Sequence, residues 1–172
     1  MIEIRQFPQN NQKQTLFTPI THIEITNMSI LGIEFTVSVE INPGNADRVW
    51  QVLSNVKSMP RYWRGGHREI DILSKDGNTY TARIKFAFPG PGNKGIARIE
   101  VHDPERLVLI NYLRGPIRGY VRNYINENSL ISQWDVRITP LFIIMKPWIK
   151  KHFMNGTTNA LMRIVSEAIN GK

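Results

Sequence analysis

The chain has no cysteine, which excludes a disulfide framework and any thiolate metal site. It also lacks long apolar runs, since the longest, residues 141–145, is far shorter than the roughly 18 residues of a membrane span. The opening residues, 1–12, lack the apolar core of a signal peptide. These absences lead us to expect a soluble, cytoplasmic protein.

Complete catalytic and metal-binding motifs are missing as well. No serine lies in a G-x-S-x-G turn and no H-E-x-x-H occurs, so the hydrolase and zinc-protease signatures are absent. The four histidines, His22, His67, His102 and His152, do not have the spacing of a metal site. We therefore predict no metal and no cofactor, and we assign no catalytic residue.

One glycine-rich motif is present but does not indicate a nucleotide site. Residues 90–95 match G-x-G-x-x-G, the fingerprint of dinucleotide-binding loops. In such proteins the motif opens a helix whose N-terminus holds the pyrophosphate. Residues 96–101 instead alternate between apolar and polar, as a strand does, so we interpret the motif as a hairpin loop.

The charge of the chain is strongly positive. A net charge of +8 and a pI near 10.0 favour an anionic partner such as nucleic acid, anionic lipid or an acidic small molecule, although solubility alone also accounts for them. Binding of single-stranded nucleic acid needs exposed aromatic residues along a basic groove. Trp50, Tyr62 and Trp63 fall at inward positions of short helices, so we do not expect nucleic acid as a partner.

Length and patterning predict one domain after a short extension. The 172 residues suffice for a single core. Residues 1–30, rich in Gln, Asn and Thr, are predicted to be an N-terminal extension, and residues 31–172 a single domain. Apolar and polar residues alternate over 33–41, which predicts a half-buried strand. Helical spacing then predicts two short helices before residue 65.

The rest of the chain is predicted to be a meander of strands and one long helix. The strands are expected at 67–73, 79–88, 95–102, 107–114, 120–125 and 130–139, with turns rich in Gly, Pro, Asn and Asp. An apolar stripe at helical spacing follows from about 141 to 169. This order indicates a helix that lies across one face of a curved antiparallel sheet.

Two segments resemble a known superfamily. FTVSVEINPGNADRVWQVLSNVKSMPRYW (35–63) is similar to its opening strand and helix pair, and ERLVLINYLRGPIRGY (105–120) to its central hairpin. The superfamily contains the START lipid-transfer domains, the birch-pollen allergen and the polyketide cyclase/dehydrase-like proteins, and is abbreviated SRPBCC. Over residues 28–169 the resemblance implies an α+β helix-grip fold. In that fold a curved antiparallel sheet of about seven strands wraps around a long C-terminal helix, with two short helices after the first strand.

The resemblance also implies a function, because the space between such a sheet and its helix either fills with side chains or stays open as a cavity. We expect binding or transport of a hydrophobic or amphipathic small molecule, such as a lipid, isoprenoid, quinone or polyketide. A cyclase- or aromatase-like enzyme using the same cavity is a first alternative, which we favour less. Binding of RNA or another acidic partner through the basic surface is a second.

The residues expected to line the cavity come from the strands and the last helix. They are Trp63, Ile84, Phe86, Phe88, Asn111, Tyr112, Tyr120, Tyr124, Trp134, Phe142, Met145, Trp148, Ile149, His152 and Phe153. Strand parity decides which member of a neighbouring pair such as Asn111 and Tyr112 faces inward. His152 fits either a general base or, as we favour, a core histidine with a structural partner.

A basic rim is expected around the cavity entrance, where glycine-rich and proline-rich loops gather beside the start of the long helix. Its residues are Arg64, His67, Lys94, Arg114, Arg118 and Lys146. Such a rim suits the acidic head of an amphipathic ligand, and it also suits transient contact with an anionic membrane. The sequence determines neither the identity of the ligand nor the oligomeric state.

Overall fold

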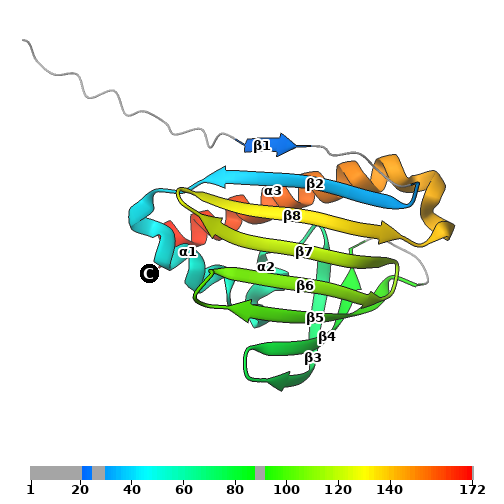
Figure 1. The fold of residues 1–172 in the computed structure, drawn as a ribbon, viewed down its shortest axis with the longest axis horizontal. Coiled ribbons are helices and arrows are strands. Elements are labelled where there is room, and N and C mark those ends of the chain that lie inside the picture. Colours follow the sequence, from blue (N-terminus) through cyan, green and yellow to red (C-terminus); the bar gives the residue numbers. More distant parts are fainter. Residues whose placement is uncertain (1–20, 25–29, 88–91, 172) are drawn as a thin grey trace, which may run out of the picture.

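The computed structural model describes residues 21–24, 30–87 and 92–171 (Figure 1). The strands are β1 (Thr21–Glu24), β2 (Gly32–Glu40), β3 (His67–Asp76), β4 (Thr79–Phe86), β5 (Lys94–His102), β6 (Leu107–Arg114), β7 (Ile117–Asn126) and β8 (Ser129–Ile138). The α-helices are α1 (Ala46–Leu53), α2 (Met59–Tyr62) and α3 (Lys146–Asn170), and the 3-10 helices are η1 (Pro43–Asn45), η2 (Val56–Ser58) and η3 (Pro140–Met145).

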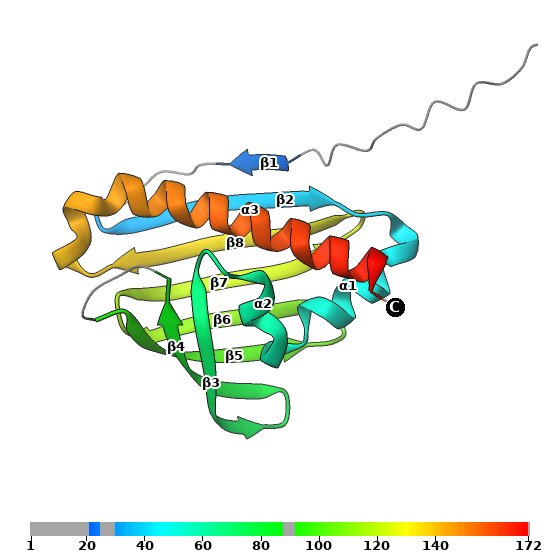
Figure 2. The same ribbon diagram turned by 180° about the vertical axis from the view of Figure 1, so that it is seen from behind.

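The strands form one antiparallel sheet in the order β1-β2-β8-β7-β6-β5-β4-β3. Figure 2 shows α3 along the hollow face of this curved sheet, over β2 and β8, with α1 and α2 on the same side. The predicted α+β arrangement of a curved sheet, two short helices after β2 and a long last helix is confirmed. β1 comes from the predicted N-terminal extension and pairs with β2 at the edge of the sheet.

The core lies between the sheet and α3. Alternation along β2 directs Ile33, Phe35 and Val37 inward, where they are buried, whereas Glu40 at the end of the strand is exposed. One stripe of α3 faces these residues and includes the buried Leu161. Burial of this apolar surface is the main stabilising term for such a two-layer domain.

The long helix begins later than its apolar pattern predicts. Residues 140–145 form η3, and regular α3 starts at Lys146. Pro147 explains the change, because a proline lacks the backbone N–H that a residue deeper in the helix would donate, so it fits only in the first turn. Within the described residues, no helix is both long and apolar enough to cross a bilayer.

Candidate functional site

Aromatic side chains meet under the middle of the sheet, with Trp134 of β8 at their centre. Its ring lies 5.4 Å from that of Phe35, 6.4 Å from that of Trp63 and 5.1 Å from that of Phe153, measured between centroids. Tyr112 of β6 lies 6.4 Å away and stacks on it. The structure therefore brings together residues from β2, β6, β8 and α3 and the residue that follows α2, and the sequence predicts most of them to face the interior.

A histidine–tyrosine pair lies beside this cluster. His67 Nε2 and Tyr112 Oη are 2.7 Å apart, and both side chains are buried. Burial lowers the pKa of His67 to about 4 and raises the pKa of Tyr112 above its ordinary value of 10.0, since neither charged form is solvated there. Both groups are therefore neutral at neutral pH, and a single hydrogen bond joins them.

The position of His67 corrects one prediction. The sequence places it on the exposed entrance rim, whereas the residue is only 1% exposed and forms the first residue of β3, inside the domain. The chain enters β3 directly from the loop that packs on α3, so the strand begins beneath the helix and not at the surface. His67 Nδ1 has no hydrogen-bond partner among the described residues.

Two further polar side chains are buried without partners. Asn123 of β7 is 0% exposed, and neither its Oδ1 nor its Nδ2 has a partner in the described part of the chain. Thr157 of α3 is 1% exposed, and its Oγ1 has no partner among the described residues either. Ser132 lies directly opposite Asn123 in the β7–β8 register, but its hydroxyl accepts a hydrogen bond from Trp134 Nε1 at 3.1 Å.

These groups have an energetic consequence. A buried polar group without a partner costs about 1–3 kcal/mol, and the large majority of buried polar groups in native proteins have a partner in the protein or in ordered water. His67 and Asn123 belong to one interior, because contacts run from His67 through Tyr112, Trp134 and Ser132 to Asn123. Aromatic and aliphatic side chains with a few polar groups among them are the usual lining of a small-molecule site.

The sequence analysis missed Asn123 and Thr157. Asn123 shares the inward register of Val121, so it was detectable as a polar residue on an otherwise apolar strand face. Thr157 follows Phe153 by four positions on the buried stripe of α3. In both cases the signal was a polar residue at an apolar position of the pattern.

Three predicted cavity residues lie on the wrong side of the sheet. Tyr112 points inward, so Asn111 next to it points outward, and Tyr120 lies opposite Asn111 in the register and is 43% exposed. Tyr124 lies opposite Leu107 on that same outer face. The prediction that Asn111, Tyr120 and Tyr124 face the interior is therefore wrong, because adjacent strand residues alternate between faces.

Of the other residues predicted to line the cavity, some are buried in the interior and others lie at the surface. Ile84, Phe86, Ile149 and Phe153 are buried, and Phe142 is partly buried. The interior placement is wrong for Met145 and Trp148, which are 47% and 50% exposed because they belong to η3 and to the first turn of α3, beyond the edge of the sheet. Phe88 lies outside the described residues.

His152 has a structural partner. Its Nε2 donates to the carbonyl oxygen of Gly65 at 2.7 Å, since a carbonyl can only accept. The backbones meet at this place, because a Cβ on Gly65 would lie 3.0 Å from the Cα of Gly156. The ring of Trp148 stacks on that of His152 at 5.0 Å. This arrangement favours a structural role for His152 over that of a general base.

The remaining rim residues are at the surface. Arg64, Lys94, Arg114 and Arg118 are exposed, and Lys146 is partly exposed. Arg64 Nε donates to the carbonyl oxygen of its neighbour Arg61 at 3.0 Å, and Lys146 Nζ donates to that of Ile30 at 2.8 Å. That these residues border an entrance stays a prediction.

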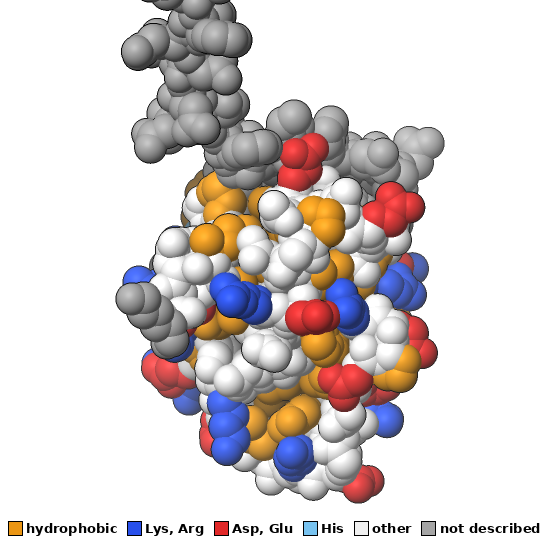
Figure 3. Space-filling view, turned by 90° about the vertical axis from the view of Figure 1, so that its left-hand side faces the viewer, with side chains coloured by type: hydrophobic (Ala, Val, Ile, Leu, Met, Phe, Trp, Pro, Cys, Tyr) orange, Lys and Arg blue, Asp and Glu red, His pale blue; other side chains and the backbone are white. Residues whose placement is uncertain are grey.

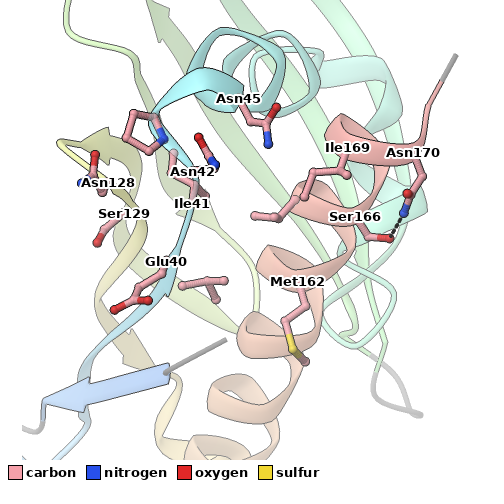
Figure 4. A pocket seen from close by; sticks show the side chains of 13 residues that line it. Glu40, Ile41, Asn42, Asn45, Asn128, Ser129, Met162, Ser166, Ile169 and Asn170 are labelled. Atoms are coloured by element: carbon pink, nitrogen blue, oxygen red, sulfur yellow. Dashed lines mark hydrogen bonds between the residues drawn. The ribbon is translucent and has the colours of Figure 1, made fainter. Parts of the chain in front are cut away.

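A groove opens at the opposite end of the sheet. It has a volume of about 810 Å³ and lies between the last turns of α3 and the connection from β2 to α1 (Figure 4). Apolar lining comes from Ile41, Met162 and Ile169, and polar lining includes Asn42 and Asn128. The groove gives access to the seam between β2 and α3, at the far end from the predicted rim.

No group of three or more His, Asp or Glu residues is placed to hold a metal ion in the described residues. In the part of the chain that the structure describes, the buried polar side chains are those of His67, Asn123, Ser132 and Thr157. None of them is charged at neutral pH, because His67 is held neutral by its burial. As far as the described residues form it, the interior thus offers neutral hydrogen-bonding groups and no ionic ones.

Comparisons with known proteins find similarity at the level of structure alone. No family model and no curated protein sequence matches the chain. Among solved structures, the Zhui aromatase/cyclase of Streptomyces sp. R1128 is similar with a TM-score of 0.61 and 17% identity, over 87% of this chain and 98% of that one. Norcoclaurine synthase of Thalictrum flavum has a TM-score of 0.53 and 16% identity, over 97% of this chain and 98% of that one.

A lipid-transfer protein is also similar. The STAR-related lipid transfer protein fragment of Xanthomonas axonopodis has a TM-score of 0.55 and 13% identity, over 87% of this chain and 93% of that one. At sequence identities this low, structural similarity shows that the fold is shared and does not show a shared activity. The chain has the START-like helix-grip fold that the sequence resemblance implies.

Proposed function

We propose that the chain binds a hydrophobic or amphipathic small molecule between the sheet and α3. The observation that carries this proposal is the amide of Asn123, which is fully buried and has no partner for either of its polar atoms among the described residues. A ligand that supplies those hydrogen bonds removes the cost of burying the amide. Solved structures of the same fold include a STAR-related lipid transfer protein, which is consistent with such a ligand.

The chemistry of the interior narrows the class of ligand. Aromatic and aliphatic side chains make up most of it, so the body of the ligand is apolar. Asn123 offers a donor and an acceptor and Thr157 a hydroxyl, so the buried polar group of the ligand is an uncharged carbonyl or hydroxyl. An acidic head, as the sequence suggested, fits only outside the interior, near the exposed arginines and lysines.

Replacing Asn123 by leucine is expected to stabilise the protein and to weaken ligand binding. The change removes two unpartnered buried groups at similar volume, so the free energy of unfolding should rise by about 1–3 kcal/mol. Loss of the hydrogen bonds to the ligand should raise its Kd about tenfold or more. Native mass spectrometry of the purified protein measures the retained small molecule, Nile red titration measures affinity, and urea unfolding measures stability.

Thr157→Val should act in the same direction, because it removes an unpartnered hydroxyl without a change of shape. Thr158→Val is the matched control, since the neighbouring Thr158 hydroxyl already donates to the carbonyl oxygen of Met154 at 3.0 Å. If the wild type retains no small molecule and does not enhance Nile red fluorescence, the proposed function is wrong. It is equally wrong if Asn123→Leu raises stability and leaves binding unchanged.

A second candidate is an enzyme that transfers protons on the bound molecule. The His67–Tyr112 pair favours it, because two titratable groups lie within hydrogen-bond reach inside the same interior. Tyr112 can donate its proton to a ligand oxygen while the neutral imidazole of His67 accepts one, which is the chemistry that cyclisation or dehydration of a carbonyl compound requires. One of the similar solved structures is named as an aromatase/cyclase, which is an enzyme of this kind.

Tyr112→Phe separates the two candidates. Removal of the hydroxyl should leave the Kd for Nile red within about threefold, because the ring stays in the aromatic cluster. If the chain is an enzyme, turnover of an aromatic-forming poly-β-ketone, followed by absorbance, should fall by about 100-fold or more. A wild-type rate no greater than that in buffer would remove the enzyme candidate and leave the binding proposal intact.

A further inference from the structure

Apolar side chains are exposed together where η3 leads into α3. Leu141 is 83% and Ile144 is 92% exposed, and Ile143, Met145 and Trp148 are also among the exposed large apolar residues. Isolated exposed apolar residues are common, but a contiguous group of them marks an interaction surface. We call these five residues the apolar tip.

Positive charge surrounds the apolar tip. Lys150 and Lys151 follow it on α3, and Lys146 lies within it along the chain. Thr139, which precedes η3, donates to the carbonyl oxygen of Pro116 at 2.9 Å. This bond places the β6–β7 turn, which Arg114 and Arg118 flank, next to η3. The cations of this end are Lys94, Arg114, Arg118, Arg137, Lys146, Lys150 and Lys151.

Acidic residues are absent from the segments that form this end. No Asp or Glu occurs in 136–166, in 113–118 or in 92–96. Arg118 and Arg137 lie directly opposite each other in the β7–β8 register, an arrangement of like charges that destabilises a sheet unless an anion is nearby. Acids border this end at two places: Asp135 lies two residues from Arg137 on the outer face of β8, opposite Glu34 of β2, and Glu69 of β3 is close enough to Lys94 to be influenced by its charge.

The opposite end of the molecule differs. Figure 3 shows the face that carries α1, where Lys and Arg are interspersed with Asp and Glu. Arg61–Glu167 and Arg106–Asp47 form ion pairs there. The excess of positive charge is therefore concentrated at the end that carries the apolar tip.

We propose that the apolar tip inserts into the surface of an anionic lipid bilayer while the surrounding lysines and arginines contact the lipid headgroups. Exposed leucine, isoleucine and tryptophan beside lysine is the composition of interfacial membrane anchors, in which tryptophan lies at headgroup level. Lysine is depleted at protein–protein interfaces, which argues against a protein as the occupant. The proposal does not depend on the ligand in the interior.

Vesicle binding tests this proposal. The wild type is mixed with phosphatidylcholine vesicles, or with vesicles that also contain phosphatidylserine, and the bound fraction is measured by sedimentation at low and at physiological salt. We expect binding to the anionic vesicles only. The double variant Leu141→Ser/Ile144→Ser should lower the vesicle partition coefficient about tenfold or more, and Lys150→Gln/Lys151→Gln should lower it by a similar factor.

Matched control variants test whether vesicle binding depends on this end of the molecule in particular. Leu73→Ser/Ile169→Ser changes exposed apolar residues elsewhere, and Lys57→Gln/Lys75→Gln removes the same charge from η2 and β3, so both should bind like the wild type. Trp148→Phe should abolish the blue shift of tryptophan fluorescence on binding, because the other three tryptophans lie away from the tip. Circular dichroism of each variant verifies that it is folded.

Three outcomes would overturn the proposal. The first is no binding to anionic vesicles at low salt. The second is binding that Leu141→Ser/Ile144→Ser leaves unchanged, which would make the attraction purely electrostatic. The third is concentration-dependent dimerisation that this double variant abolishes, measured by analytical ultracentrifugation, because the tip would then be an interface between copies of the chain.

Discussion

Val37→Asp is expected to leave the domain unfolded at 25 °C. Val37 is fully buried in the middle of β2, directly opposite Ser132 of β8 and beneath α3. A carboxylate at this position is either ionised without a counter-charge or protonated at the cost of a large pKa shift, and such changes destabilise by more than about 4 kcal/mol. That loss is comparable with the whole stability of a small domain, which is roughly 5–15 kcal/mol.

The adjacent position supplies the control. Ser38 follows Val37 on β2, faces the other side of the sheet and is partly exposed. Ser38→Asp introduces the same charge into the same strand and should cost less than about 1 kcal/mol. Far-ultraviolet circular dichroism and urea unfolding of both variants give the comparison, and similar losses at the two positions would mean that β2 is not packed as described.

The second large effect concerns pH. Acidification from pH 7 to pH 4 is expected to cost roughly 3 kcal/mol of stability through His67 alone. Burial holds its pKa at about 4 in the folded protein, below the ordinary value of 6.5. Between these values the unfolded chain binds a proton that the folded chain does not. The stabilising contribution is therefore complete above pH 6.5 and is lost as the pH falls toward 4.

His67→Phe should remove this pH dependence, because phenylalanine fits among Trp63 and Phe86 and does not titrate. Urea unfolding at pH 7, 5.5 and 4 measures the difference between variant and wild type, so that contributions of carboxylates cancel. His102→Gln is the control, since His102 is partly exposed beside Glu100 on β5. An unchanged slope in His67→Phe would show that His67 is solvated in the folded protein.

The architecture was predictable because its signals are local. Alternation along β2 and β4 and the apolar stripe after residue 145 each depend on neighbouring residues only, and the structure places strands and a helix at these positions. The start of α3 was misjudged because the apolar run 141–145 resembles a helix in composition, whereas Pro147 sets where regular helix can begin. β7 begins at Ile117, three residues before its predicted start, because the turn at Gly115 and Pro116 is tight.

The candidate site was harder to predict because it depends on which face each strand presents. The aromatic residues Trp63, Tyr112 and Trp134 were identified from composition and position, but Tyr120 fell on the opposite face. The burial of His67 follows from how the loop before β3 packs on α3, which no periodicity records. Asn123 and Thr157 stand out in the sequence as polar residues at apolar positions, but their lack of hydrogen-bond partners among the described residues depends on how separate elements pack.

The free edge of β3 bears on self-association. β3 is the last strand of the described sheet, so one side of its backbone has no neighbouring strand among the residues that the structure describes. Its exposed charged residues include Glu69, Asp71 and Lys75, and its pairing with β4 is interrupted by two register shifts. Charge and irregularity at an open edge hinder the addition of a foreign strand, which is how soluble sheets avoid amyloid-like stacking. The irregular pairing and the charges of β3 thus oppose strand addition at this edge of the described sheet.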